Sequence, residues 1–275
     1  FLANMSHEIR TPMNAIKGMT DILIRRNPNE DQKEYLDGIK QSSDSLLVII
    51  NDILDISKIE AGKVELEHEP FSVNELVNNV HTIMQFKAEE KGLELKKDLP
   101  ADELIVKGDS TRLRQILINL IGNAIKFTEK GLVTTTIKSD KVDGKLNLHF
   151  TVSDTGIGIS AENQKRLFQE FTQVGEATKH IHGTGLGLVI TRNLLSLMHG
   201  TIMLSSEVGK GTEFNVHIPL NYKVVEGEIL KHTDPVSEPF PANNKFQVPH
   251  ILLVEDNEVN QLISKTMLKR LNCDV

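Results

Sequence analysis

The adjacent pair His7 and Glu8 is the first place in the chain where the residue types could do chemistry. A neutral imidazole is a nucleophile, and a neighbouring carboxylate can hold one ring nitrogen while the other stays free to attack. The surrounding apolar residues recur with spacings of three and four, which is typical of a coiled-coil seam, at Leu2, Met5, Ile9, Pro12, Ile16, Met19 and Leu23. With Leu2 at heptad position a, His7 lies at position f and faces water. From this stretch alone a surface histidine on a charged helix is the alternative, whereas a zinc site is excluded because Thr11 stands where a second histidine is needed.

A second group of polar residues shares one face of a predicted helix over residues 109–127, which Asp109 and Ser110 can cap. Asn119, Asn123 and Lys126 follow one another at i, i+4 and i+7, opposite an apolar face. Two carboxamides and an ammonium on one face could hold a magnesium ion and phosphate oxygens. A solvated polar face is the alternative.

Two glycine-rich stretches each lie next to a predicted element. Residues 154–158, Asp-Thr-Gly-Ile-Gly, follow a strand, where the Asp154 carboxylate can accept a hydrogen bond from an exocyclic amine and the glycines let backbone approach a flat ring. Residues 183–187, Gly-Thr-Gly-Leu-Gly, open a helix whose free N–H groups suit polyphosphate. The alternatives are an ordinary turn with Asp154 as a helix cap, and a simple loop over residues 173–182 in place of a lid. The phosphate loop GxxxxGK[ST] does not occur in the sequence.

The composition narrows the class of protein. The net charge of -7 argues against a binder of nucleic-acid phosphates. The single cysteine, Cys273, excludes an internal disulfide and a cysteine-based zinc site. The sequence contains no apolar run long enough to span a bilayer. Because Phe1 lies inside a helical pattern, we interpret the chain as a fragment of something longer.

Two long helices, over residues 1–26 and 32–60, predict an α-helical hairpin as a first domain, residues 1–62. Pro12 predicts a bend in the first of them. The apolar stripe of the second helix is wider than one partner helix can cover, so two chains are expected to pair into a four-helix bundle. The alternative is a monomeric hairpin packed on the second domain.

A second domain is predicted over residues 71–220, where strands and helices mix in an α+β two-layer sandwich. Ser72 and Glu75 form a capping box for a helix ending near Lys91, and strands are expected at 64–67, 104–106, 132–138 and 146–153. Helices follow at 161–168 and 186–198, and a final hairpin pairs residues 201–206 with 212–218. Residues 221–249 read as a proline-rich linker, and 250–275 begin a new unit with a strand at 251–254 and a helix at 258–271.

The order of these pieces resembles the sensor histidine kinases. SHEIRTP, NLIGNAIKF, DTGIG, FQEF and GTGLGL look like the H, N, G1, F and G2 boxes of that family, in that order, over residues 1 to about 220. Residues 209–214, GKGTEF, are similar to the family's closing hairpin. Residues 250–275 resemble the start of a response-regulator receiver domain of α/β fold, with Glu255 and Asp256 matching its acidic pair, a metal site that these residues leave incomplete.

The resemblance implies a dimerisation and phosphoacceptor domain followed by an ATP-binding domain of the gyrase and histidine-kinase type. His7 would be the phosphoacceptor, Glu8 its acid/base partner and Thr11 the position linked to phosphatase activity. Asn123 would hold Mg²⁺ and Asp154 the adenine amine. The other residues implied in ATP binding are Asn119, Lys126, Gly156, Gly158, Gly183, Thr184, Gly185, Leu186, Gly187 and Thr212.

The expected function is therefore that of a hybrid sensor histidine kinase core. It takes a phosphoryl group from ATP, with Mg²⁺, onto a histidine and passes it to an aspartate of a receiver domain, its own or a separate one. The alternatives are a plain ATPase of the same nucleotide fold, a dimeric scaffold, and a receiver phosphatase. We expect these residues to be cytoplasmic, in a parent protein for which an anchor in the inner membrane stays open.

Overall fold

A computed structural model of the chain describes residues 2–142, 145–169, 172, 184–220 and 250–254, and positions 261, 264, 265, 268, 273 and 274. Side chains are described from Glu8 onward, except at 141, 142 and 145. The chain divides into two compact units, residues 1–54 with 227–275 and residues 55–226, and each is described by itself below. The predicted domain limits at residues 62 and 71 stay predictions.

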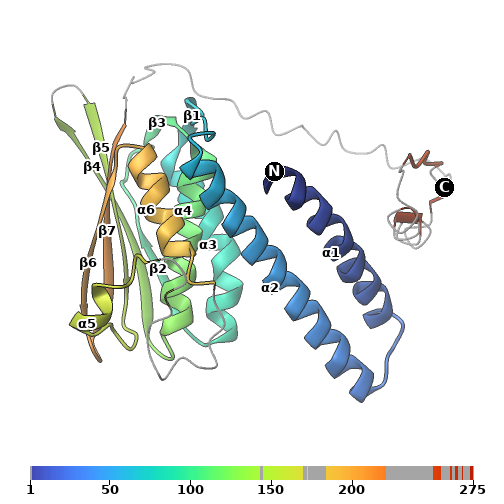
Figure 1. The fold of residues 1–275 in the computed structure, drawn as a ribbon. Coiled ribbons are helices and arrows are strands. Elements are labelled where there is room, and N and C mark those ends of the chain that lie inside the picture. The colour runs from blue at the N-terminus through green and yellow to red at the C-terminus, as the bar shows by residue number, and fades with distance from the viewer. Residues whose placement is uncertain are drawn as a thin grey trace, which may run out of the picture. The chain divides into compact units, whose positions relative to one another are not determined.

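The first unit contains most of the predicted helical hairpin, whose second helix continues past residue 54 into the second unit. Helix α1 (Leu2–Ile24) runs without interruption through Pro12, and α2 (Glu30–Glu60) begins two residues earlier than predicted (Figure 1). Asn29 and Gln32 bind each other reciprocally at the start of α2, because the Gln32 N–H donates to Asn29 Oδ1 at 2.8 Å and the Asn29 N–H donates to Gln32 Oε1 at 3.1 Å. This capping box satisfies N–H groups that the first turn leaves without helical partners.

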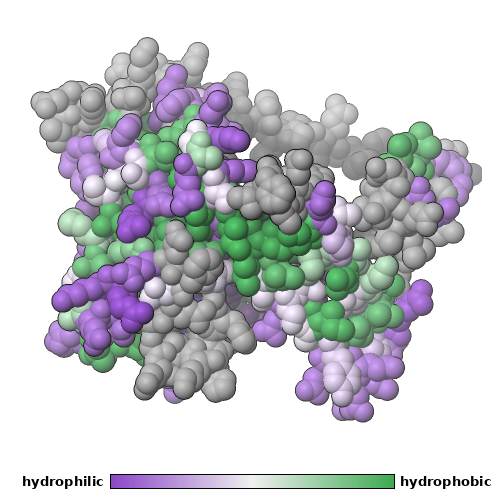
Figure 2. Space-filling view, viewed as in Figure 1, coloured by the Kyte–Doolittle hydropathy of each residue, from purple (hydrophilic) through white to green (hydrophobic). Residues whose placement is uncertain are grey.

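Ion pairs and hydrogen bonds fix the antiparallel alignment of α1 and α2. Lys17 and Lys40 pair with Asp44 and Asp21, respectively, each at 2.6 Å. The two helices still leave apolar side chains in water, and Figure 2 shows hydrophobic surface along the hairpin and a hydrophilic loop end. The exposed members include Ile16, Met19, Leu23, Ile39, Leu46 and Ile53. The stripe is the one that the spacing of the sequence predicted.

The second unit is built on a five-stranded sheet in the order β2-β4-β5-β7-β6. Its strands are β2 (Glu94–Asp98), β4 (Leu132–Val142), β5 (Lys145–Asp154), β6 (Thr201–Glu207) and β7 (Gly211–Leu220). Strands β2 and β4 are parallel, and the other pairs are antiparallel. A separate antiparallel pair joins β1 (Glu69–Ser72) to β3 (Ile105–Gly108).

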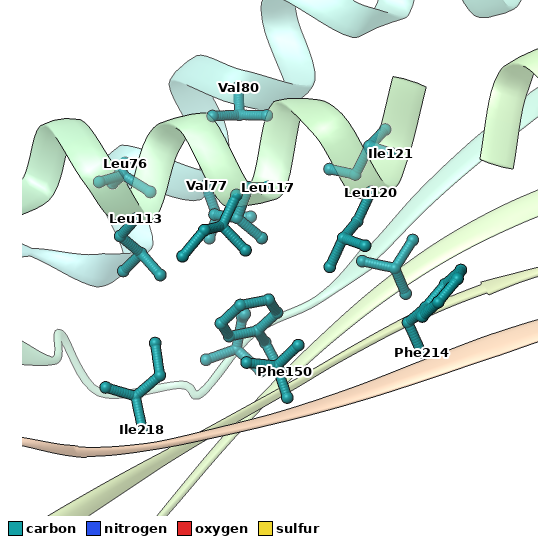
Figure 3. Close-up of a cluster of buried hydrophobic side chains, with 14 of the residues drawn as sticks. Leu76, Val77, Val80, Leu113, Leu117, Leu120, Ile121, Phe150, Phe214 and Ile218 are labelled. Carbon is teal, nitrogen blue, oxygen red and sulfur yellow. The ribbon is translucent and has the colours of Figure 1, made fainter. Parts of the chain in front are cut away.

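Helices α3 (Val73–Glu90), α4 (Ser110–Phe127) and α6 (Gly187–Leu197) lie along one face of this sheet (Figure 1). The core forms between the two layers, where leucines and isoleucines of α4 meet Phe150 and Ile218 of the sheet (Figure 3). Side chains of α3 such as Val77 and Val80 close the same core. The predicted two-layer sandwich is therefore confirmed.

Several predicted elements differ in the structure. Residues 64–67 form no strand, because the neighbouring residues 69–72 take the place beside β3 instead. The helix predicted over 161–168 is only α5 (Ala161–Gln164), which has no buried residue to extend it, and i+3 turns follow. Strand β2 was not predicted from the sequence.

The predicted receiver fragment is not confirmed. Residues 251–254 form no strand, because the β-bridge described in this part of the chain is a single isolated one between His250 and Asp274. Leu252 and Val254 are accordingly 88% and 85% exposed. Glu255, Asp256 and most of the helix predicted at 258–271 lie outside the described residues. In the described part of the chain, every helix is too short or too polar to cross a bilayer.

Candidate functional site

Helix α4 carries the polar face that the sequence singled out. Its N-cap Asp109 accepts from the Arg112 N–H at 2.9 Å and from the Glu67 N–H at 3.2 Å, so one buried carboxylate fixes both the helix start and the segment before α3. The apolar face of α4 is fully buried against the sheet. Packing of that face leaves Asn119, Asn123 and Lys126 half-buried on the remaining side.

The two asparagines of α4 belong to a small hydrogen-bond network. Asn119 Nδ2 donates to Thr191 Oγ1 of α6 at 2.7 Å, and Asn123 Nδ2 donates to Asn119 Oδ1 at 3.5 Å. Gly187 lies against the same amide, where a Cβ would collide with Asn119 Oδ1. The polar face of α4 and the first turn of α6 are therefore in contact, which brings two of the predicted motifs together.

This network orients the Asn123 side chain so that its oxygen can act as a metal ligand. Because Asn123 Nδ2 points at Asn119, its carbonyl oxygen is the atom left for a ligand. A carbonyl oxygen, like carboxylates, waters and phosphate oxygens, is one of the oxygen ligands that Mg²⁺ takes. The residue present therefore fits a nucleotide-bound Mg²⁺.

Lys126 occupies the last turn of α4. Burial lowers the pKa of its ammonium, and the charge of Lys91 lowers it further. Its Nζ lies 5.0 Å from the centre of the Phe127 ring, a cation–π distance. A half-buried ammonium without a carboxylate among these contacts is suited to an anionic ligand such as phosphate.

Asp154 ends β5 beside Thr212 of β7, its partner in the sheet register. Burial raises the pKa of the Asp154 carboxyl, and the N–H groups of Gly156 and Thr212 oppose that rise by binding the carboxylate. The Gly156 N–H donates to Asp154 Oδ1 at 2.8 Å, which fixes the side chain. Both Asp154 and Thr212 line a hollow of about 360 Å³ at the end of β5, β6 and β7, which α4 does not reach. An acceptor held at the edge of an open space can bind an exocyclic amine.

The loop after Asp154 is held against the β6–β7 hairpin. Gly158 has φ +66°, and a Cβ there would collide with the carbonyl of Glu207, so the position requires glycine. The next residue is fixed by Ser206, whose Oγ accepts from the Ile159 N–H and donates to the Gly211 carbonyl, both at 2.8 Å. Gln164 Nε2 adds bonds to the carbonyls of Ile159 and Ser206 at 2.8 and 2.9 Å.

The second glycine-rich stretch is described from Thr184 onward, and Gly183 with the predicted lid at 173–182 lies outside the described residues. Thr184 Oγ1 accepts from the Leu186 N–H at 3.1 Å, and Gly185 has φ +71°. Helix α6 then begins without a side-chain cap. Its first N–H groups remain suited to an anion, as the sequence predicted.

His7 lies within α1, and its side chain is outside the described residues, so its orientation toward water stays a prediction. The neighbouring Glu8 is exposed. One turn further on, Arg10 Nη2 donates to Asn51 Oδ1 of α2 at 3.3 Å, which ties this part of α1 to its partner helix. The structure therefore divides the predicted site residues between the two units.

Three residues that support the site were not found from the sequence: Thr191, Ser206 and Lys91. Each acts from a segment far along the chain: Thr191 is 72 residues from Asn119, Lys91 is 35 residues from Lys126, and Ser206 is 47 residues from Ile159, the residue after the first glycine-rich stretch. The sequence offers one signal for the first, since a threonine inside the apolar helix α6 calls for a polar partner.

Two family profiles match the chain. The profile described as "His Kinase A (phospho-acceptor) domain" covers residues 1–62, and "Histidine kinase-, DNA gyrase B-, and HSP90-like ATPase" covers residues 108–222. The signal transduction histidine-protein kinase BarA of Escherichia coli (strain K12) is 43% identical over 236 residues, which is 82% of this chain and 25% of BarA. The autoinducer 2 sensor kinase/phosphatase LuxQ of Vibrio cholerae serotype O1 is 36% identical over 277 residues, 100% of this chain and 32% of LuxQ.

A solved structure, full-length ShkA in complex with AMPPNP, is similar with a TM-score of 0.68 and 36% identity. The match covers 80% of this chain and 45% of ShkA. The chain thus spans about a quarter to a third of the curated relatives named above.

Proposed function

We propose how this chain works from one premise: it belongs to the sensor histidine kinases. Both family domains and the identities with BarA and LuxQ support that membership. As a member, the chain is the ATP-dependent protein-histidine kinase core of two-component signalling. The residues that perform the transfer, the metal and the partners are proposals.

The first proposed step is phosphoryl transfer from ATP to His7. A ring nitrogen attacks the γ-phosphorus in line, the new N–P bond forms as the bond to the bridging oxygen breaks, and ADP leaves. Glu8 holds the other ring nitrogen and takes up the proton that the ring loses. What supports Glu8 in this role is its position beside His7 and its exposure to water.

The observation that carries the nucleotide site is the contact between α4 and α6 at Asn119, Thr191 and Gly187. It joins the polar face that ends in Lys126 to the uncapped start of α6. We assign the phosphates to this junction, because an ammonium and free helix N–H groups bind anions there. We assign the adenine amine to Asp154, which has a buried carboxylate at the edge of a hollow.

The metal belongs to the nucleotide in this proposal. Asn123 would hold Mg²⁺ through its carbonyl oxygen, and the bound ion supplies neutralisation of phosphate charge. The protein residues do the rest: Asn119 and Lys126 orient the phosphates, and the glycines of residues 184–187 bring backbone N–H groups close to them.

We propose a homodimer through the hairpin, since α1 and α2 leave an apolar stripe exposed that a second hairpin would bury. We also propose a response-regulator receiver as the acceptor of the phosphoryl group, either downstream of residue 250 or on another protein, and a cytoplasmic place of action where ATP is available. The acidic pair Glu255 and Asp256 stays part of that proposal.

The test is phosphorylation with γ-labelled ATP of the wild type and His7→Gln. We expect an acid-labile label on the wild type and none on the variant, because a carboxamide cannot form the N–P bond. A label of the same stability on His7→Gln would exclude His7 as the acceptor. Release of free phosphate without labelled protein would instead favour a plain ATPase.

A receiver phosphatase activity is a second candidate, supported by Thr11 one turn after His7 and by the kinase/phosphatase name of LuxQ. Loss of label from a phosphorylated receiver on adding His7→Gln would support it, and equal loss with His7→Gln carrying Thr11→Ala would refute the role of Thr11.

A further inference from the structure

The C-terminal end of α4 matters for the proposed site because Asn123, Lys126 and the loop after Asp154 all depend on it. The last four carbonyls of any α-helix lack partners within the helix. In α4 the Ala124 carbonyl accepts from Thr128, through its N–H at 3.1 Å and its Oγ1 at 2.7 Å. The Phe127 carbonyl accepts from the Ile157 N–H at 3.3 Å, which connects α4 directly to the loop after Asp154 (residues 155–159), called the adenine loop below because we assign the adenine amine to Asp154.

The two carbonyls between these are bound by a single side chain from another helix. Lys91 Nζ donates to the Ile125 carbonyl at 2.9 Å and to the Lys126 carbonyl at 2.8 Å. It also lies 3.5 Å from the Thr128 carbonyl. Each of the last four carbonyls of α4 therefore has a partner, and Lys91 binds two of the four.

Lys91 is held in place by its own backbone, and its positive charge suits the C-terminal end of α4. It is the C-cap of α3, where its backbone N–H donates to the carbonyls of Ala88 and Glu89. Its ammonium lies at the negative end of the α4 dipole, where a cation is favoured, and its bonds to carbonyls are charge-assisted. The charge of Lys91 also acts on Lys126, the residue proposed to bind phosphate, and lowers the pKa of its ammonium.

We propose that Lys91 is a positioning residue for ATP: it holds the last turn of α4 so that Lys126 meets the phosphates and Phe127 anchors the adenine loop. The inference rests on the proposed nucleotide site. Without this ammonium the Ile125 and Lys126 carbonyls must find water, and the turn that carries them opens outward. Lys91 does not contact the reacting atoms, so the effect falls on nucleotide binding and not on the transfer step.

Four variants of the whole chain test this inference: Lys91→Met, Lys91→Gln, Lys91→Arg and the control Lys87→Met, which removes an exposed lysine one turn earlier on α3. We expect Lys91→Met to raise the dissociation constant for ATP about tenfold, equivalent to about 1.4 kcal/mol. The kcat of autophosphorylation at saturating ATP should change by less than about twofold. Lys91→Arg, which keeps the charge and several donors, should bind ATP within about threefold of wild type.

The outcomes are distinguishable. Lys91→Met that binds ATP as wild type does would overturn the inference, and so would a loss of thermal stability with an unchanged dissociation constant. If Lys91→Met does not fold, Lys91→Gln, which keeps a neutral amide N–H₂ donor group but no charge, replaces it in the same comparison. Asn123→Asp separates the two proposals: wild-type ATP affinity in that variant refutes the nucleotide site itself. Weakened binding there, together with normal binding in Lys91→Met, refutes only the role of Lys91.

Discussion

His81 offers a prediction whose size follows from the structure. Its side chain lies on α3, is 5% exposed, and has no hydrogen-bond partner for Nε2 among the described residues. Burial, and secondarily the charge of Lys97 on β2, lowers the pKa of His81 from 6.5 to about 4. The folded domain therefore holds His81 neutral at pH values where the unfolded chain has already taken up a proton.

The sign and magnitude of the pH effect on the free energy of unfolding follow from proton linkage. Because the folded pKa lies below the unfolded one, this contribution to stability is complete above about pH 7 and is lost as the pH falls from 6.5 to about 4. The gap between the two pKa values, at about 1.36 kcal/mol per pKa unit, gives a full loss of about 3 kcal/mol. At pH 5 the same relation gives a loss of about 2 kcal/mol in the free energy of unfolding.

The perturbation is His81→Phe, which keeps a ring of similar width but neither titrates nor buries an unpaired nitrogen. Urea unfolding of the whole chain at pH 7.5 and 5.0, followed by the core methyl signals of Ile116 and Ile218, reports on this domain alone. Between pH 7.5 and 5.0, the free energy of unfolding of the wild type should fall by about 2 kcal/mol more than that of His81→Phe. His199→Asn, at an exposed histidine with φ +56°, is the control and should lose as much as wild type. An equal loss in the wild type and His81→Phe would refute the reasoning.

Three further predictions concern the site and the hairpin. Asn123→Asp should lose metal-dependent ATP affinity by about tenfold or more, because its carboxylate adds a negative charge beside the phosphates and no longer donates to Asn119 Oδ1, and titration with ATP with and without Mg²⁺ measures it. Thr191→Val should weaken ATP binding by about threefold to tenfold, since it removes the acceptor that orients Asn119, whereas Thr191→Ser should not; equal affinities for the two would contradict this. Met19→Lys should weaken the dimer at least about tenfold in sedimentation equilibrium, because the stripe loses an apolar side chain in both subunits. Asn14→Lys, at an exposed polar position, is its control, and equal dimer strength in both would count against the stripe as the interface.

The elements that could be predicted from the sequence are those with strong local signals. Helix α4 has the predicted bounds because Asp109 caps it and one face is continuously apolar. Strand β4 was found from its β-branched residues, and Ser72 accepts from the Glu75 N–H at 3.2 Å as the capping pattern predicted. In each case the residues that decide the structure lie within one or two turns of each other.

The elements that were missed depend on distant partners. Strand β2 has the sequence Glu-Leu-Lys-Lys-Asp, which shows little apolar alternation, and it is a strand because it pairs in parallel with β4. Residues 64–67 alternate well but have no strand beside them, so alternation alone was misleading. For an edge strand the neighbouring strand decides the conformation more than its own side chains do.

The same division separates the site residues from those that support them. Asn119, Asn123 and Lys126 could be predicted because helical spacing alone places them on one face. Their supports could not, since Lys91 acts from the end of another helix and Thr191 from helix α6, 72 residues beyond Asn119. A motif thus predicts which groups would meet the nucleotide, whereas the contacts that fix their orientation come from residues that no motif contains. Since the last turn of α4 receives partners from the end of α3, from Thr128 and from the loop after Asp154, a change in any of the three should alter the position of Lys126.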